Sequence, residues 1–127
     1  MEEWSMRIIV PEIPPTNNQY MGNSHSFREY NRMKEYWHWL IRAGIKERPE
    51  QPYQKAVVTI TYFFPDRRKR DPDNYSGKFI LDPLVREKII KDDSFDNIVL
   101  HIQKGGADKQ NPRTVIEVEE IRDAENL

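Results

Sequence analysis

Residues 55–64, KAVVTITYFF, restrict the range of possible folds more than any other stretch of the sequence. Nearly every position is β-branched or aromatic, a composition typical of a strand that is at least partly buried on both faces. The next ten residues, PDRRKRDPDN at 65–74, change abruptly from apolar to charged. The sequence therefore predicts a buried strand that leads directly into a charged loop.

Before this strand, the sequence predicts a shorter strand and one long helix. Residues 6–13, MRIIVPEI, indicate the strand, and the Pro-Pro pair that follows ends it because proline fixes φ and lacks an N–H donor. The polar residues 16–24 predict a loop. From Ser26 onward, apolar residues recur at steps of three and four, which indicates an amphipathic helix that ends near Pro49.

A second helix is predicted within residues 74–90, where apolar side chains again recur at helical spacing. Pro83 lies inside this segment. Asp82 and Pro83 either form an N-cap followed by a first-turn proline, which would split the segment in two, or they mark a kink in one helix. The sequence leaves both alternatives open.

Two further strands are predicted after that helix. Residues 98–103 and 116–119 alternate apolar with polar side chains, and they flank a polar loop at 105–112. We expect these two strands to pair with each other as a hairpin with a polar outer face. The fold class that results is α+β, with a small mixed sheet of about four strands and two main helices in a single domain spanning residues 1–127.

Composition limits the metal sites and compartments that the chain can have. There is no cysteine, and the three histidines (His25, His38 and His101) are scattered, so a bound metal must be held mainly by carboxylates. No apolar stretch approaches the roughly 20 residues that a membrane span needs, and the acidic opening is unlike a signal peptide. We therefore expect a soluble, cytoplasmic protein.

The charged loop contains the first group of residues that could bind a metal ion. In an extended backbone, Asp71 and Asp73 would point to the same side about 6.6 Å apart, and Pro72 biases Asp71 toward that conformation. Two neighbouring carboxylates repel each other unless a cation lies between them. A hard divalent ion such as Mg²⁺ suits this pair because it prefers oxygen ligands.

A second acidic group, Asp92 and Asp93 with Asp96, follows the predicted second helix. If that helix returns the chain to the end of the central strand, one of these carboxylates can complete the first pair. The four cations Arg67, Arg68, Lys69 and Arg70 would then hold a phosphate backbone beside a metal that activates water. Lys78, one to two turns into the predicted helix, could neutralise charge in the transition state or orient the water.

Each motif taken alone has a simpler interpretation. An Asp-x-Asp is more often a solvated turn than a metal site, and a basic run is more often a solvated loop than a binding surface. The net charge of −1 gives no sign of a nucleic-acid partner. A calcium loop starting at Asp71 is disfavoured, because Gly77 comes one place late and Asp82 replaces the closing Glu.

Taken together and in order, the motifs resemble the RusA family of Holliday-junction resolvases, small endonucleases associated with phage and prophage genomes. The resemblance covers most of the chain, and the ordered set is far more specific than any single motif. It rests on the following residues: Pro14-Pro15-Thr16-Asn17-Asn18, Pro65-Asp66, the basic residues before Asp71-x-Asp73-Asn74, Lys78, Asp82, and Asp92-Asp93.

The resemblance implies a homodimeric α+β nuclease that cuts four-way DNA junctions symmetrically on two strands and uses Mg²⁺, or Mn²⁺ in its place. The essential aspartates would be Asp71, Asp73 and Asp93, with Asp92 as a weaker metal ligand, and the catalytic lysine would be Lys78. Lys78 departs from the family pattern, since it stands five residues beyond Asp73 where four are common. An alternative is a non-catalytic prophage protein that binds branched DNA, and a calcium-stabilised interaction module is a third.

Overall fold

The computed structural model describes residues 5–17 and 27–122. It consists of a four-stranded mixed sheet and two main helices, which confirms the α+β prediction. The elements in chain order are β1 (Ser5–Val10), α1 (Phe27–Gly44), β2 (Ala56–Phe63), the short 3-10 helix η2 (Pro72–Asn74), α2 (Lys78–Arg86), β3 (Ile98–Lys104) and β4 (Arg113–Glu120). The loop predicted at residues 16–24, together with His25 and Ser26, lies largely outside the described residues.

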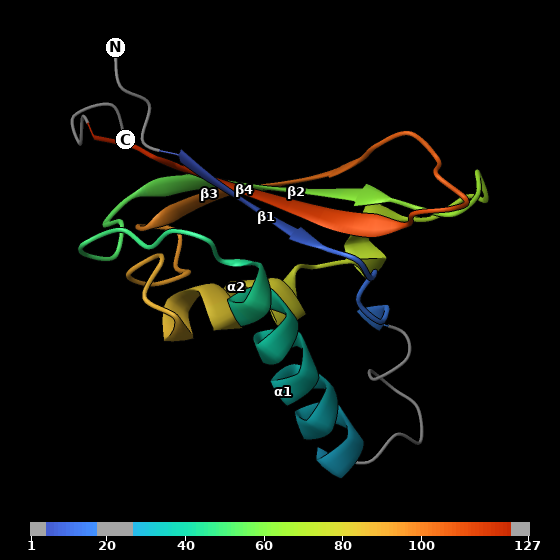
Figure 1. Cartoon of the computed structure of the whole chain (residues 1–127), viewed down its shortest axis with the longest axis horizontal. Helices are drawn as coiled ribbons and strands as arrows, with labels where there is room; N and C mark the ends of the chain where they lie inside the picture. The colour runs from blue at the N-terminus through green and yellow to red at the C-terminus, as the bar shows by residue number, and fades with distance from the viewer. Residues whose placement is uncertain (1–4, 18–26, 123–127) are drawn as a thin grey trace.

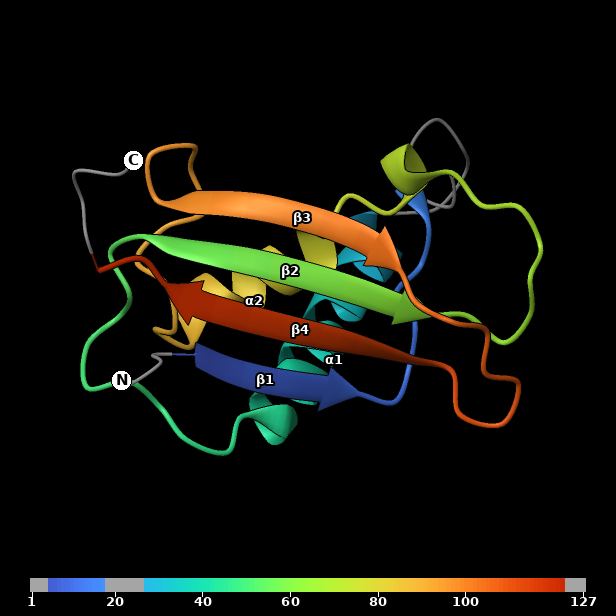
Figure 2. The ribbon, with the colours of Figure 1, turned by 90° about the horizontal axis from the view of Figure 1, so that it is seen from above.

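The strands are ordered β1-β4-β2-β3 across the sheet, as Figure 2 shows. β4 pairs antiparallel with both β1 and β2, whereas β2 and β3 run parallel. The prediction that the last two strands form a hairpin is therefore wrong, because β2 lies between them. Their connection crosses the end of β2, where the Gly105 N–H donates to the Tyr62 carbonyl and the Asp108 N–H to the Phe64 carbonyl.

Burial explains why β4 takes the interior position. Its residues Val115, Ile116 and Val118 are all buried, whereas most of β3 is exposed or half-buried, as suits an edge strand. If β4 were the edge strand of a hairpin with β3, it would have only one neighbouring strand, and no second strand would lie beside its apolar side chains.

Both helices lie on one face of the sheet (Figure 1). Alternate side chains of the two central strands point toward them, and the register places Ile60 opposite Ile116 and Val58 opposite Val118. Trp37 of α1, almost fully buried, joins this core. Gly44 ends α1, and a Cβ there would lie 2.8 Å from the Ile8 side chain, so the end of the helix packs directly on β1.

The helix predicted within residues 74–90 starts later than expected, at Lys78, because Gly77 adopts a left-handed conformation (φ 80°) that separates it from η2. Pro83 does not split α2. It is buried inside the helix, and the Glu87 N–H donates to its carbonyl at 2.8 Å. β1 ends at Val10, earlier than predicted, because Pro11 already lacks the N–H that a ladder needs. In the part of the chain that is described, no helix combines the length and apolarity needed to span a membrane.

Candidate nuclease site

The charged loop lies beyond the end of β2 and presents two exposed carboxylates. Asp71 is extended (φ −100°, ψ 131°), as its position before Pro72 predicted. Asp73 instead lies in the 3-10 turn of η2, closed by the Asn74 N–H donating to the Asp71 carbonyl at 3.0 Å. The two aspartates share one exposed turn, but the expectation that both lie on an extended backbone is wrong for Asp73.

Asn17, from the segment after β1, braces this turn. Its Nδ2 donates to the Asp73 carbonyl at 3.0 Å, and its Oδ1 accepts from the Ser76 hydroxyl at 3.2 Å. Asn17 therefore fixes the backbone on both sides of the turn without occupying either carboxylate. In the sequence, Asn17 stood out only as part of a motif, because its structural role depends on a contact between residues 56 positions apart.

The second acidic group lies at the opposite end of the sheet. The Lys91 N–H donates to the Tyr53 carbonyl at 2.9 Å and the Asn97 Nδ2 to the Gln54 carbonyl at 2.8 Å, which holds Asp92 and Asp93 near the start of β2. In Figure 2 the turn before β3 and the helix η2 lie at opposite ends of the strands. A strand of eight residues separates its ends by about 23 Å.

The expectation that helix α2 returns the chain to the end of the central strand is therefore wrong. β3 runs parallel to β2, so the crossover must bring the chain back to the beginning of β2. Within the described ranges, no group of three acidic or histidine side chains is close enough together to hold a metal ion.

Lys78 is the first residue of α2, rather than one to two turns into it, and it is exposed. Its Nζ lies 5.2 Å from the centre of the Tyr30 ring, on α1. Lys34 approaches the same ring at 5.8 Å and also pairs with Asp82 at 3.5 Å. The ammonium group of Lys78 thus lies between the charged loop and α1.

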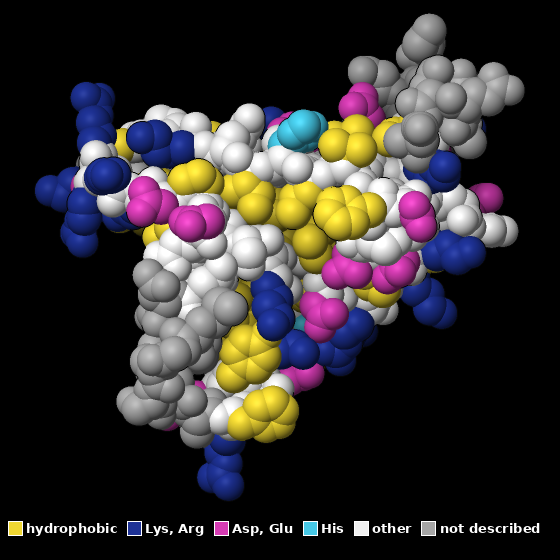
Figure 3. All heavy atoms as spheres, turned by 180° about the vertical axis from the view of Figure 1, so that it is seen from behind, with side chains coloured by type: hydrophobic (Ala, Val, Ile, Leu, Met, Phe, Trp, Pro, Cys, Tyr) yellow, Lys and Arg dark blue, Asp and Glu magenta, His cyan; other side chains and the backbone are white. Residues whose placement is uncertain are grey.

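The four cations of the basic run separate into two kinds. Arg70 is largely buried: its Nη1 donates to Asp66 Oδ1 at 2.8 Å, and its guanidinium lies 4.3 Å from the centre of the Phe64 ring. The hydrogen bond from Arg70, with a second from the Arg68 backbone, lowers the pKa of Asp66. The side chains of Arg67, Arg68 and Lys69 remain exposed. Figure 3 shows basic side chains gathered at one end of the molecule with acidic side chains beside them.

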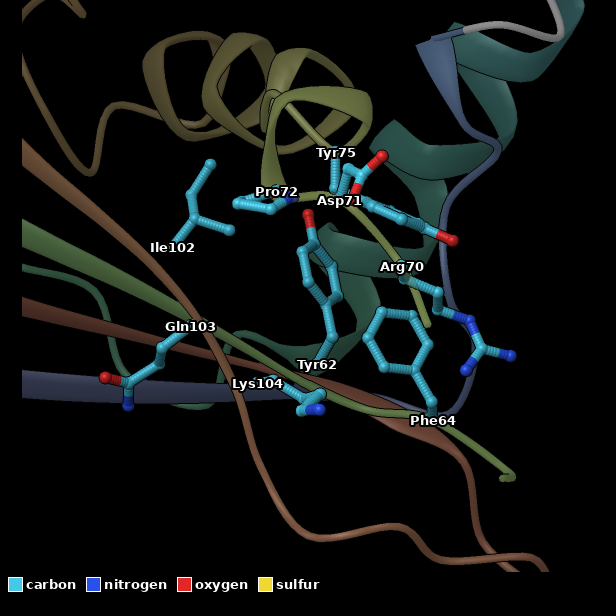
Figure 4. A pocket seen from close by; sticks show the side chains of 9 residues that line it. All are labelled: Tyr62, Phe64, Arg70, Asp71, Pro72, Tyr75, Ile102, Gln103 and Lys104. Carbon is cyan, nitrogen blue, oxygen red and sulfur yellow. The ribbon is translucent and has the colours of Figure 1, made fainter. Parts of the chain in front are cut away.

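A cavity of about 260 Å³ opens beside Asp71. Three aromatic rings pack around it: the Tyr75 ring centre lies 5.3 Å from those of both Tyr62 and Phe64. The sequence pattern placed residues 62 and 64 in a buried strand and did not predict the cavity, although Tyr75, two residues beyond Asp73, was a signal for an aromatic residue near the site. The full lining, drawn in Figure 4, is Tyr62, Phe64, Arg70, Asp71, Pro72, Tyr75, Ile102, Gln103 and Lys104.

Comparison with protein families identifies the family of this chain. The family model described as endodeoxyribonuclease RusA matches residues 12–119, which include both helices, the charged loop, β2, β3 and all of β4 except its last residue. No curated protein matches the chain.

Proposed function

Because the chain belongs to the RusA endodeoxyribonuclease family, we propose that it cuts four-way DNA junctions by paired, symmetric, metal-dependent incisions. Membership supports nuclease action on Holliday junctions in recombination. The observation that carries the finer proposal is the charged loop, where Asp71 and Asp73 are exposed beside a run of exposed cations. A phosphodiester is negatively charged, so two carboxylates repel it. A divalent ion bound to the acidic pair would remove this repulsion and hold the phosphate.

The donor set fits Mg²⁺, with Mn²⁺ as a substitute. Asp71, Asp73, Asp92 and Asp93 are all exposed and offer only carboxylate oxygens, the ligands that hard cations prefer. When bound, the ion would supply an activated water and stabilise the leaving oxygen. We assign Asp71, Asp73 and Asp93 to the reaction, and Asp92 as an additional ligand.

The positions of these groups favour a homodimer with shared sites. Asp71 and Asp73 lie at one end of the sheet and Asp92 and Asp93 at the other, so one chain does not bring them together. A two-fold axis that exchanges the two ends of the sheet would place Asp92 and Asp93 of each subunit beside the pair of the other. Such a dimer would have two equivalent sites, as paired symmetric incisions require.

The cations take distinct roles in this proposal. Arg67, Arg68 and Lys69 contact the phosphate backbone, because they are exposed and next to the acidic pair. Arg70, which sequence reasoning placed in the same group, is a positioning residue that holds the loop through Asp66 and Phe64. Lys78 neutralises charge on the phosphate that is cut.

The test mixes two inactive variants. Asp73→Asn and Asp93→Asn proteins should each fail to cut a synthetic four-way junction with Mg²⁺, and EDTA should abolish cutting by the wild type. In a mixed dimer, shared sites would combine both substitutions in one site and leave the other site fully wild type. We therefore expect the mixture to recover single-strand nicking, to about half of the wild-type nicking rate at most.

Two controls make the outcome specific. Glu50→Gln changes an exposed carboxylate between α1 and β2 and should leave cutting unchanged. A mixture that exchanges subunits yet stays inactive would refute shared sites. A wild-type protein that binds the junction but does not cut it with Mg²⁺ would identify a passive branched-DNA-binding protein and overturn the nuclease proposal.

A further inference from the structure

The cavity beside Asp71 has aromatic walls to which the proposed reaction assigns no role. It lies where β2 and β3 end, and Tyr62, Phe64 and Tyr75 provide its aromatic walls (Figure 4). Its volume of about 260 Å³ is just below the usual range of small-molecule sites, which begins near 300 Å³. The space therefore accommodates a single small ring system.

The hydroxyl of Tyr62 shows that the cavity suits a ligand with a polar edge. Tyr62 is 2% exposed, and its hydroxyl has no hydrogen-bond partner among the described residues. Figure 4 shows this hydroxyl directed toward Pro72, inside the ring of lining residues. A buried hydroxyl without a partner is costly and uncommon in native proteins, so it marks a place where an incoming polar group can be bound.

The surroundings of the cavity favour an occupant attached to an anionic chain. Lys104 and Arg70 line it from β3 and from the charged loop, and the exposed residues of the basic run continue outward from Arg70. Aromatic side chains stack on the faces of bases regardless of sequence, which suits walls formed by tyrosine and phenylalanine. A flat ring with a hydrogen-bonding edge and a phosphate on either side has these properties.

Building on the proposed function, we propose that this cavity receives one nucleobase, turned out of the stack next to the phosphate that is cut. The Tyr62 hydroxyl bonds the edge of the base, and the aromatic walls hold its faces. Turning out a base costs least where it is already poorly stacked or unpaired. In the open form of a four-way junction, the central base pairs each lack one stacking neighbour, so the cavity would favour branched DNA over linear duplex.

A phenyl ring is the alternative occupant of the cavity, and it differs from a base because it has no polar edge. Phe95 is fully exposed, two residues beyond Asp93, and in a dimer with shared sites it would approach the same region of the other subunit. A phenyl ring would leave the Tyr62 hydroxyl without a partner, so the cavity fits a base better. The two occupants are separated by experiment.

The first measurement uses binding alone. Deoxynucleoside monophosphates, added without metal, should shift the methyl NMR signals of Ile102, and Ile102→Phe, which fills the cavity, should abolish binding. The second measurement compares cutting of junctions that differ in the base beside the cut. We expect wild type to prefer one base by about tenfold, Tyr62→Phe to reduce that preference to about twofold, and Tyr53→Phe, at the other end of β2, to retain it.

Each result decides between the hypotheses. Cutting of junctions with no base preference and no shift at Ile102 would overturn the cavity proposal and leave the nuclease proposal intact. Nucleotide-dependent shifts in a protein that cuts no junction would support the cavity and overturn the nuclease proposal. Shifts at Ile102 that follow dimerisation, disappear in Phe95→Ala and ignore nucleotides would identify Phe95 as the occupant and overturn the base.

Discussion

Replacing Tyr62 by Phe should make the protein more stable, which is unusual for a buried side chain in a core strand. The substitution keeps the ring, whose packing against Phe64 (centres 5.8 Å apart) and Tyr75 is unchanged, and it removes only the unpartnered hydroxyl. A buried polar group without a hydrogen bond costs about 1–3 kcal/mol. We expect a gain of about 1 kcal/mol in the free energy of unfolding, which for a domain of this size raises Tm by about 3–6 °C.

The gain in stability from Tyr62→Phe should grow at high pH, because burial keeps the Tyr62 hydroxyl protonated in the folded protein. Burial raises the pKa of Tyr62 above its ordinary value of 10.0, so the folded protein retains a proton that the unfolded chain releases. Ionisation of this group in the unfolded chain therefore lowers the stability of the wild type as pH rises above 10 toward the folded pKa. The Tyr62→Phe variant has no group to titrate at this position, so its advantage in stability over wild type should widen above pH 10.

Urea unfolding followed by tryptophan fluorescence measures the gain, and calorimetry gives Tm. The matched control is Tyr53→Phe, since Tyr53 is also buried (7% exposed) but is not among the side chains whose polar atoms lack a partner. It should gain nothing. If Tyr62→Phe lowers the free energy of unfolding by more than about 0.5 kcal/mol, the hydroxyl is hydrogen-bonded in the free protein. The cavity would then offer no free polar group to a ligand.

Two further predictions follow from the charged residues. Burial of Glu87 (10% exposed) acts to raise its pKa, but hydrogen bonds from Arg48 and His38 prevail and hold that pKa below 4.5. Its stabilisation is therefore lost as pH falls below about 4.5, and Glu87→Gln should unfold about 1–3 kcal/mol more easily at pH 7, with a flatter dependence of Tm on pH between 3 and 7. Changing the three exposed cations at positions 67–69 to Gln should reduce the log–log salt slope of junction binding by about 2–3, whereas Arg70→Gln should lower Tm and leave that slope within about one unit. Equal slopes in both variants would refute the separation of Arg70 from the other cations.

Local patterns predicted the parts of the fold that depend on local chemistry. Apolar residues spaced three and four positions apart predicted the location of α1, because one face of that helix packs on the sheet. The β-branched run at 55–64 located β2, because β-branched and aromatic side chains pack well in a central strand whose inner face lies against the helices. Pro72 correctly predicted an extended Asp71, since the ring of a proline excludes the helical conformation from the residue before it.

Strand order could not be predicted in the same way, since it depends on which distant segments compete for a neighbour. Residues 98–103 and 116–119 follow each other in the sequence and both alternate apolar with polar side chains, so a hairpin was the simplest hypothesis. The apolar surface of β4 instead takes the place between β1 and β2. β3 then pairs in parallel with the other edge of β2, and the two acidic groups lie at opposite ends of the sheet.

The same geometry explains why the acidic turn can be exposed and still be well positioned. Asn17 holds its backbone from the segment after β1, and Arg70 anchors the preceding loop on Phe64. Gly77 follows it in a conformation that other residues avoid, and a Cβ there would lie 3.1 Å from the Ile60 side chain. The residue added before Lys78, relative to the common family spacing, is therefore accommodated within a turn that is fixed at both ends. Asn17, Arg70 and Gly77 therefore fix the backbone of the turn but add no oxygen ligand to its two carboxylates; under the proposed function, a second subunit and the substrate phosphate would supply the remaining ligands of the metal ion.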